Sequence, residues 1–126
     1  MTAGTEVNLE RIESARRALR GIVQTTPLIR SRFLTERMGG QVFLKAENLQ
    51  RTGSFKIRGA YYRMLCLTED ERRRGVVAAS AGNHAQGVAW AADKLGIRAT
   101  VVMPETAPIA KVEATRASGA EVLLHG

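Results

Sequence analysis

The sequence predicts an α/β fold with a parallel sheet, and the second half of the chain carries this prediction. From residue 76 onward, short apolar segments alternate with stretches of helical length in a βαβαβ series. Gly96 and Gly119 stand where glycine commonly ends a helix, and Pro108 stands where proline commonly begins one. This alternation favours parallel strands joined by right-handed crossovers. The expected strands are 76–79, 100–103 and 121–124, and the expected helices are about 84–95 and 109–118.

The first half of the chain contains two favourable helix N-caps, Asn8 and Ser31, and a Gly39-Gly40 pair that is typical of a turn. Thr26-Pro27 interrupts the helical pattern between the two caps. In chain order, we expect a helix from Asn8 to about Ile22, an extended segment over 28–30 and a helix from Ser31 to Met38. A strand over 41–47 should follow. Further on, we expect a short helix that is capped by Thr68 and ended by Gly75.

A helix that starts with a lysine is expected after the polar loop that ends in Thr52-Gly53-Ser54. Glycine permits a tight turn, Ser54 is a good N-cap, and apolar positions then recur at roughly helical spacing to about Leu67. Lys56 therefore lies in the first helical turn, where the helix dipole favours a neutral amine, the form that Schiff-base chemistry requires. An isolated lysine at such a position is more often a solvated surface cation, so the interpretation depends on the residues around it.

The composition is that of a soluble globular protein, with 44% hydrophobic and 25% charged residues. No apolar run approaches the roughly 18 residues needed to span a bilayer, and the first residues lack the pattern of a signal peptide. We therefore expect a cytoplasmic protein with no membrane partner. The single cysteine, Cys66, has no histidine or second cysteine near it in sequence, so we expect a buried structural thiol and no metal site.

The net charge of +7 would ordinarily suggest a nucleic-acid partner. The basic residues form short clusters on expected exposed helix faces, such as Arg72-Arg73-Arg74, and no aromatic residues are interleaved for base stacking. We therefore expect no nucleic-acid partner.

Two motifs relate the chain to a known family. Ser54-Phe55-Lys56-Ile57-Arg58-Gly59-Ala60 resembles the pyridoxal-phosphate attachment segment of the serine/threonine dehydratases, which are fold-type II (tryptophan-synthase-β-like) enzymes. Ser80-Ala81-Gly82-Asn83-His84-Ala85-Gln86-Gly87 resembles the loop with which the same family contacts the substrate carboxylate and the cofactor. The motifs occur in the family's order and at about its separation. The resemblance extends from about Thr26 to Gly126 and is closest to the threonine ammonia-lyases.

The resemblance implies that the cofactor is pyridoxal 5'-phosphate, bound as a Schiff base to Lys56, whose freed amine then acts as the base at the substrate Cα. It also implies that the Phe55 ring lies against the cofactor and that the amide of Asn83 contacts the cofactor's phenolic oxygen. From the residues alone, Phe55 could be a core aromatic and Asn83 a helix cap. Three nearby cations have no such assignment and are expected to be scaffold or surface charges: Lys45, Arg51 and Arg58.

Residues 80–84 are expected to form the turn from the carboxyl end of a strand into a helix N-terminus, the usual anion site of an open α/β sheet. The resemblance implies that this turn holds the substrate carboxylate through the backbone and hydroxyl of Ser80 and through its neighbours. Those neighbours are Ala81, Gly82, Asn83 and His84. For His84, simple support of the loop is an equally good interpretation.

The reaction implied by the resemblance is deamination of threonine, and of serine, by β-elimination to 2-oxobutanoate or pyruvate and ammonia. The alternatives are a serine dehydratase or serine racemase of the same fold, or a non-enzymatic α/β module that binds an anion at residues 80–84. Ala81 favours elimination, because serine racemases of the family tend to carry a second serine there as an acid/base, and alanine has no proton to donate.

Enzymes of this family are much longer than 126 residues and have two lobes, so the chain is expected to be an N-terminal fragment. Residues 1–67 would be the N-terminal part of the large cofactor-binding lobe, including the lysine loop. Residues 68–126 would be the first βαβαβ part of the small lobe. The loop that holds the cofactor phosphate is expected beyond residue 126. We expect the complete protein to be a homo-oligomer, and the chain alone to be weakly active or inactive.

Overall fold

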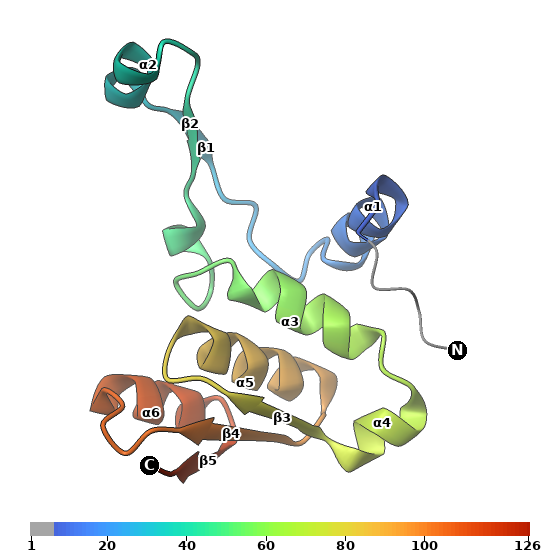
Figure 1. Cartoon of the computed structure of the whole chain (residues 1–126). Coiled ribbons are helices and arrows are strands. Elements are labelled where there is room, and N and C mark those ends of the chain that lie inside the picture. Colours follow the sequence, from blue (N-terminus) through green and yellow to red (C-terminus); the bar gives the residue numbers. More distant parts are fainter. Residues whose placement is uncertain (1–6) are drawn as a thin grey trace.

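The computed structural model describes residues 7–126, and its core is a parallel sheet of three strands. The strands are β3 (Val76–Ala79), β4 (Ala99–Met103) and β5 (Glu121–Leu124), in the order β3-β4-β5. Helices α5 (Asn83–Leu95) and α6 (Ile109–Ala117) connect successive strands, as Figure 1 shows. The predicted α/β parallel sheet is confirmed, and these elements start and end within one residue of their expected positions.

The two faces of this sheet differ in what covers them. Val101 is paired with Ala78 on one side and Val122 on the other, so the three side chains share one face. Val101 is completely buried, whereas Val77, on the opposite face, is 77% exposed. Successive right-handed crossovers in one direction place both connecting helices on the same face, and α5 packs against α6 there. The Val77 face is open in the described chain.

Helix α3 (Lys56–Leu65) forms a further layer on α5 (Figure 1). At the contact, a Cβ built on Gly87 of α5 would lie 3.1 Å from both the carbonyl carbon and the Cβ of Lys56. Glycine at this position therefore lets the first turn of α3 approach α5 closely. The buried residues of α3 recur at helical spacing and are Ile57, Ala60, Tyr61 and Met64.

Helix α3 begins at Lys56, so the prediction that Lys56 lies in the first helical turn is confirmed. The predicted cap residue is wrong by one position, because Phe55 already has helical backbone angles and takes the cap position without a side-chain cap hydrogen bond. Ser54 is buried, and its hydroxyl accepts a long hydrogen bond of 3.4 Å from the Lys56 backbone N–H. Ser54, the residue before the N-cap, thus supports the start of the helix.

The short helix α4 (Glu69–Arg74) starts and stops as the sequence predicts. Thr68 and Glu71 form a complete capping box at its start. Gly75 ends it with a φ of 85°, and a Cβ at this position would lie 2.8 Å from the Arg98 carbonyl oxygen. Both the backbone angle and the close approach to the residue before β4 require glycine.

The N-terminal helix α1 (Leu9–Ala18) has Asn8 as its N-cap, as expected, and the Asn8 side chain accepts a hydrogen bond from the Arg11 backbone N–H. The helix ends at Ala18 rather than at about Ile22. The chain continues from there in turns, and Leu19 is buried in the common core.

An arm extends from the body of the molecule in Figure 1. It consists of β1 (Leu28–Arg30) and β2 (Phe43–Lys45), which pair antiparallel, with α2 (Arg32–Met38) between them. The strand expected over 41–47 is shorter, because the chain turns at Glu47–Leu49 into a 3-10 helix, η1. The antiparallel pairing was not predicted. Large apolar side chains on the arm are exposed: Leu28, Ile29, Phe33, Met38, Phe43 and Leu44.

Cys66 directly follows α3 and is exposed, so the prediction of a buried thiol is wrong. Its position falls outside the stripe of buried residues that faces α5. Within residues 7–126, no helix is long and apolar enough to cross a membrane, and no group of three His, Cys, Asp or Glu side chains could hold a metal ion. The lobe boundary after residue 67 remains a prediction, since α3 before it and α5 after it share one core.

Gly75→Ala is expected to destabilise the fold by about 1–3 kcal/mol, because alanine would be strained at a positive φ and its Cβ would meet the Arg98 carbonyl oxygen. Urea unfolding followed by circular dichroism measures the loss. Gly59→Ala is the matched control. Gly59 lies inside α3 with nothing within 4 Å of an added Cβ, so this change should stabilise the protein by about 0.5–1 kcal/mol. Equal effects of the two changes would contradict the prediction.

Candidate active site

The N-termini of α3 and α5 lie at the same end of the helix pair (Figure 1). Gly87 approaches Lys56, the first residue of α3, and Asn83, the first residue of α5, lies about one helical turn before Gly87. The lysine loop and the Ser80–His84 turn, which are distant in sequence, are therefore brought to one place. Helix α6 reaches the same place, because its residue Lys111 donates a hydrogen bond to Asn83.

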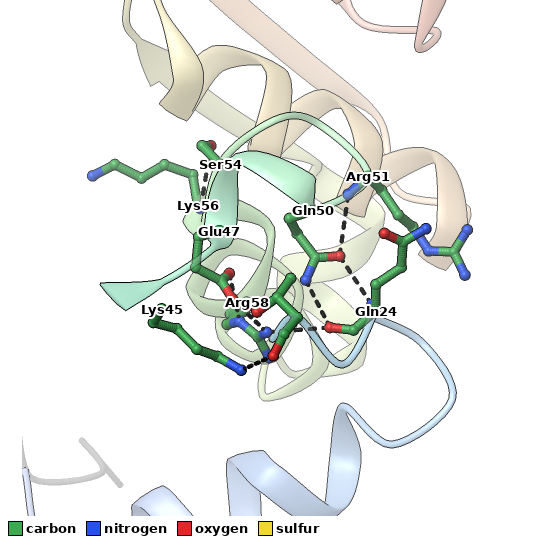
Figure 2. Close-up of polar contacts among 9 residues, drawn as sticks. Gln24, Lys45, Glu47, Gln50, Arg51, Ser54, Lys56 and Arg58 are labelled. Atoms are coloured by element: carbon green, nitrogen blue, oxygen red, sulfur yellow. Dashed lines mark hydrogen bonds and ion pairs between the residues drawn. The ribbon is translucent and has the colours of Figure 1, made fainter. Parts of the chain in front are cut away.

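Lys56 presents its amine away from the nearest charged side chains. Its Nζ lies 5.2 Å from the centroid of the Phe55 ring, and Figure 2 shows the side chain extending away from Glu47 and Arg58. Within residues 7–126, no ion pair or hydrogen bond holds this Nζ. The Phe55 ring is 57% exposed, so Phe55 is not a core aromatic in the described chain. The Phe55 ring is thus accessible to a ligand, and the Lys56 amine lies next to it.

The loop that leads to Lys56 is anchored by an ion pair between Glu47 and Arg58 (Figure 2). Arg58 donates from Nε to Glu47 Oε2 and from Nη2 to Oε1, each at 2.8 Å, and the Thr26 hydroxyl donates to the same carboxylate. The hydrogen-bonded Arg58 guanidinium is the main cause that lowers the pKa of Glu47 from 4.5 to about 2. Arg58 is therefore a scaffold charge, as expected, and it joins α3 to the segment before β1.

Gln50 provides a second anchor. Its side-chain oxygen accepts from the Gln24 backbone N–H, and its side-chain nitrogen donates to the Gln24 carbonyl oxygen, both at 2.9 Å. Arg51 adds a hydrogen bond of 3.0 Å to the Ile22 carbonyl oxygen. Sequence reasoning missed Glu47 and Gln50. The anchor pairs Glu47–Thr26 and Gln50–Gln24 are 21 and 26 residues apart, and no local pattern marks such a contact.

The Ser80–His84 turn leaves the start of α5 without a side-chain cap. The Ser80 backbone N–H donates to the Val102 carbonyl oxygen at 3.0 Å, and the Ser80 hydroxyl accepts from the Gly82 N–H at 3.2 Å. Gly82 is the N-cap residue, and Asn83 accepts a hydrogen bond from Lys111 instead of capping its own helix. The helix-cap interpretation of Asn83 is therefore wrong. The first backbone N–H groups of α5 remain suited to an anion.

These residues fit the reactive end of pyridoxal phosphate. An amine with no ion-pair partner in the described part of the chain can bind its aldehyde, an exposed ring can lie against its pyridine ring, and an amide can donate to its phenolic oxygen. The residues concerned are Lys56, Phe55 and Asn83. Ser80, Ala81 and Gly82 form the turn beside them, while His84 is exposed and its role remains a prediction.

A cavity of about 280 Å³ lies elsewhere, between the end of α5, the start of β4 and the end of α6. Its lining includes Ala92, Gly96, Arg98 and Ser118. Because the strands are parallel, the start of β4 lies at the end of the sheet opposite to the Ser80–His84 turn. The cavity is therefore separate from the candidate active site.

The chain belongs to the family of pyridoxal-phosphate dependent enzymes, whose family model matches residues 19–126. It is 58% identical to L-threonine ammonia-lyase from Thermotoga maritima over 120 residues, which cover 95% of this chain and 30% of that protein. It is 53% identical to the L-threonine dehydratase catabolic TdcB from Staphylococcus aureus, with coverage of 95% and 35%. The chain thus spans about a third of the length of these curated relatives.

Solved structures support the same fold. The crystal structure of serine racemase from Dictyostelium discoideum matches with a TM-score of 0.86 and 37% identity, over 94% of this chain and 38% of the racemase. The processed form of threonine deaminase isoform 2 from Solanum lycopersicum matches with a TM-score of 0.78 and 38% identity, over 97% and 35%. The predicted family, its fold type and its cofactor are confirmed by these comparisons. The roles of individual site residues remain predictions.

Glu47→Gln is expected to lower the free energy of unfolding at pH 7 by about 1–3 kcal/mol, because it removes the charged partner of Arg58. The pKa of Glu47 is about 2 in the folded chain and ordinarily 4.5, so the carboxylate stabilises the fold above about pH 4.5. This contribution is lost as the pH falls toward 2. Urea unfolding at pH 7 and pH 3 measures both effects.

Glu36→Gln is the control for this change. Glu36 pairs with Arg32 on the exposed surface of α2, where the two side chains are 62% and 92% exposed. Its loss should therefore change stability by less than about 0.5 kcal/mol. An equal loss in both variants, or a Glu47→Gln effect that is the same at both pH values, would contradict the prediction.

Proposed function

We propose that this chain is the lysine-bearing part of an enzyme that deaminates threonine, and serine, by β-elimination to 2-oxobutanoate or pyruvate and ammonia. The observation that carries the proposal is the close approach of α3 to α5 at Gly87, which brings the backbone of Lys56 to the helix end where, within residues 7–126, no side chain caps α5. The choice of threonine is supported by the 58% identity to L-threonine ammonia-lyase from Thermotoga maritima.

Lys56 has two proposed tasks. Its Nζ would hold pyridoxal phosphate through the aldehyde carbon, and the same Nζ, when it is free, would take the proton from the substrate Cα. When bound, the cofactor supplies an electron-withdrawing ring that delocalises the negative charge left at Cα. The absence of an ion-pair partner for Nζ within residues 7–126 suits both tasks, since a carboxylate partner would hold the amine in its charged form.

Phe55 and Asn83 are proposed to hold the cofactor ring. The exposed Phe55 ring offers an aromatic face beside Lys56, against which a pyridine ring can stack. The side-chain amide of Asn83 would donate to the phenolic oxygen. Both residues lie within one position of a helix start, so their backbones are held by the packing of α3 on α5.

The Ser80–His84 turn is proposed to bind the substrate carboxylate. The backbone N–H groups at the start of α5 point out of the helix, and the positive end of the helix dipole adds to their attraction for an anion. Ser80 adds a hydroxyl, and Ala81 and Gly82 offer backbone with little side chain to obstruct the ligand. This arrangement orients the Cα of a bound amino acid relative to the Lys56 amine.

Serine racemisation is the second candidate function, because the Dictyostelium discoideum serine racemase is structurally similar with a TM-score of 0.86. Ala81 argues against it, since a methyl group cannot deliver a proton to the face of the substrate opposite Lys56. A non-enzymatic anion-binding module is disfavoured by membership of an enzyme family. A serine dehydratase differs from our proposal only in substrate, and one methyl group discriminates by about 1–3 kcal/mol.

We further propose that the complete enzyme is a cytoplasmic homo-oligomer that binds neither nucleic acid nor membranes, with the amino acid as its small-molecule partner. Residues outside this chain would hold the cofactor phosphate and face the pyridine nitrogen, since the relatives are about three times longer. The chain alone would then bind the cofactor weakly.

Lys56→Ala is expected to abolish the visible absorption band that forms when pyridoxal phosphate is added to a protein of the relatives' length that contains this chain. Lys94→Ala, which removes an exposed lysine near the end of α5, should leave the band intact. Addition of threonine should alter the band in the unchanged protein, and the 126-residue chain should show a weak band or none. A band that survives Lys56→Ala, or a protein that forms no band, would refute the assignment.

Ala81→Ser is expected to raise the racemisation of serine at least about tenfold in the same protein, because the new hydroxyl supplies an acid/base opposite Lys56. Chiral chromatography of the remaining serine measures the change, and pyruvate release measures elimination in the same sample. Ala79→Ser, on the exposed side of β3, is the control and should leave both rates unchanged. If racemisation in the unchanged protein already exceeds elimination, the serine racemase becomes the better proposal.

A further inference from the structure

Lys111 makes an unusual pair of contacts at the start of α5. Its Nζ donates to Asn83 Oδ1 at 3.0 Å and to Gln86 Oε1 at 3.3 Å. Asn83 and Gln86 are three residues apart on α5, so their side chains share one face of the helix. Within residues 7–126, Lys111 forms no salt bridge with a carboxylate. Its ammonium group is thus used to bind two neutral amides.

The backbone of Lys111 is itself well held. Its N–H donates to the Pro108 carbonyl oxygen at 2.8 Å, and its carbonyl oxygen accepts from the hydroxyl of Thr115, which is completely buried. The neighbouring Val112 is 6% exposed and belongs to the core between α5 and α6. Lys111 therefore reaches Asn83 from a fixed base on the first turn of α6.

The chemistry of the ammonium group determines which way the Asn83 amide faces. A side-chain amide has an acceptor oxygen and a donor nitrogen of nearly equal size, and it can rotate to exchange them. The lysine ammonium has three donors and no acceptor, so it can bind only the oxygen. With Oδ1 held by Lys111, the Nδ2 donor must face away from Lys111. The charge on the donor also strengthens this hydrogen bond relative to one between neutral groups.

We propose that Lys111 is a positioning residue that holds the Asn83 amide in the one orientation that leaves its Nδ2 hydrogens available to the cofactor. This inference rests on the proposed function, in which Asn83 donates to the phenolic oxygen of pyridoxal phosphate. The opposite orientation would place Oδ1 against that oxygen, where two acceptors repel each other. Gln86 supports the arrangement by accepting a second hydrogen bond from the same ammonium group.

The first test uses ¹⁵N-labelled protein without cofactor, so it does not depend on the proposed function. The side-chain NH2 signal of Asn83 is assigned by its disappearance in Asn83→Ala. Lys111→Met, which keeps the apolar length of the side chain, should shift this signal, and Lys111→Arg, which retains charged donors, should restore most of its position. Lys94→Met, at an exposed site, should leave it unchanged. An Asn83 signal that Lys111→Met does not move would overturn the proposal.

The second test uses the cofactor-loaded protein of the relatives' length and a double-mutant cycle. Lys111→Met should lower kcat for threonine about tenfold and shift the visible absorption band, because a misoriented amide no longer donates to the cofactor. In an Asn83→Ala background, the same change should alter kcat by less than about twofold. Equal losses in both backgrounds would show that Lys111 acts on structure alone and would overturn the proposal. Melting temperatures establish that each variant is folded.

The two tests separate failure of this inference from failure of the proposed function. If the unchanged protein forms no band that depends on Lys56, the proposed function fails, and the signal of Asn83 still decides whether Lys111 orients its amide. If the band forms and the Asn83 signal responds to Lys111→Met but kcat does not, the function stands and the positioning role is overturned.

Discussion

The contact between the first turn of α3 and the second turn of α5 is the constraint on which the candidate site depends. Two parallel helices rarely approach so closely unless one of them lacks a side chain at the crossing, and here that residue is Gly87. The approach brings Lys56 to the end of α5 where backbone N–H groups are free of side-chain caps. A larger residue at Gly87 would force the two helix starts apart, and Lys56 would then move away from the Ser80–His84 turn.

Packing between helices positions Lys56 along α3, and the polar anchors position the loop that precedes it. The bidentate Glu47–Arg58 ion pair and the double hydrogen bond of Gln50 to Gln24 join the loop to a segment far away in sequence. Charge-assisted hydrogen bonds that are partly shielded from water are strong, so this ion pair keeps the loop in one conformation. These anchors determine where Lys56 emerges from its loop. On the other side of the candidate site, Lys111 of α6 holds Asn83 by a hydrogen bond.

The described chain exposes apolar surfaces, as expected of a chain that spans only about a third of its relatives' length. One face of the parallel sheet is uncovered around Val77, and the β1–β2 arm carries exposed apolar side chains such as Phe33 and Phe43. Surfaces of this kind are normally buried in a complete domain. We propose that further residues of the complete enzyme cover them, which would also close the candidate site around Lys56 and the Ser80–His84 turn.

The sequence by itself determined the local features: the βαβαβ order, the caps at Asn8, Ser31 and Thr68, the place of Lys56 in a first helical turn, and the family. Each depends on the residue's own backbone preference or on neighbours a few positions away, so a local pattern records it. Only the tertiary structure revealed the antiparallel pairing in the arm, the anchoring by Glu47 and Gln50, the exposure of Cys66 and the hydrogen bond from Lys111 to Asn83. These depend on residues brought together from distant parts of the chain, and no spacing along the sequence encodes that a lysine on α6 will meet an asparagine on α5.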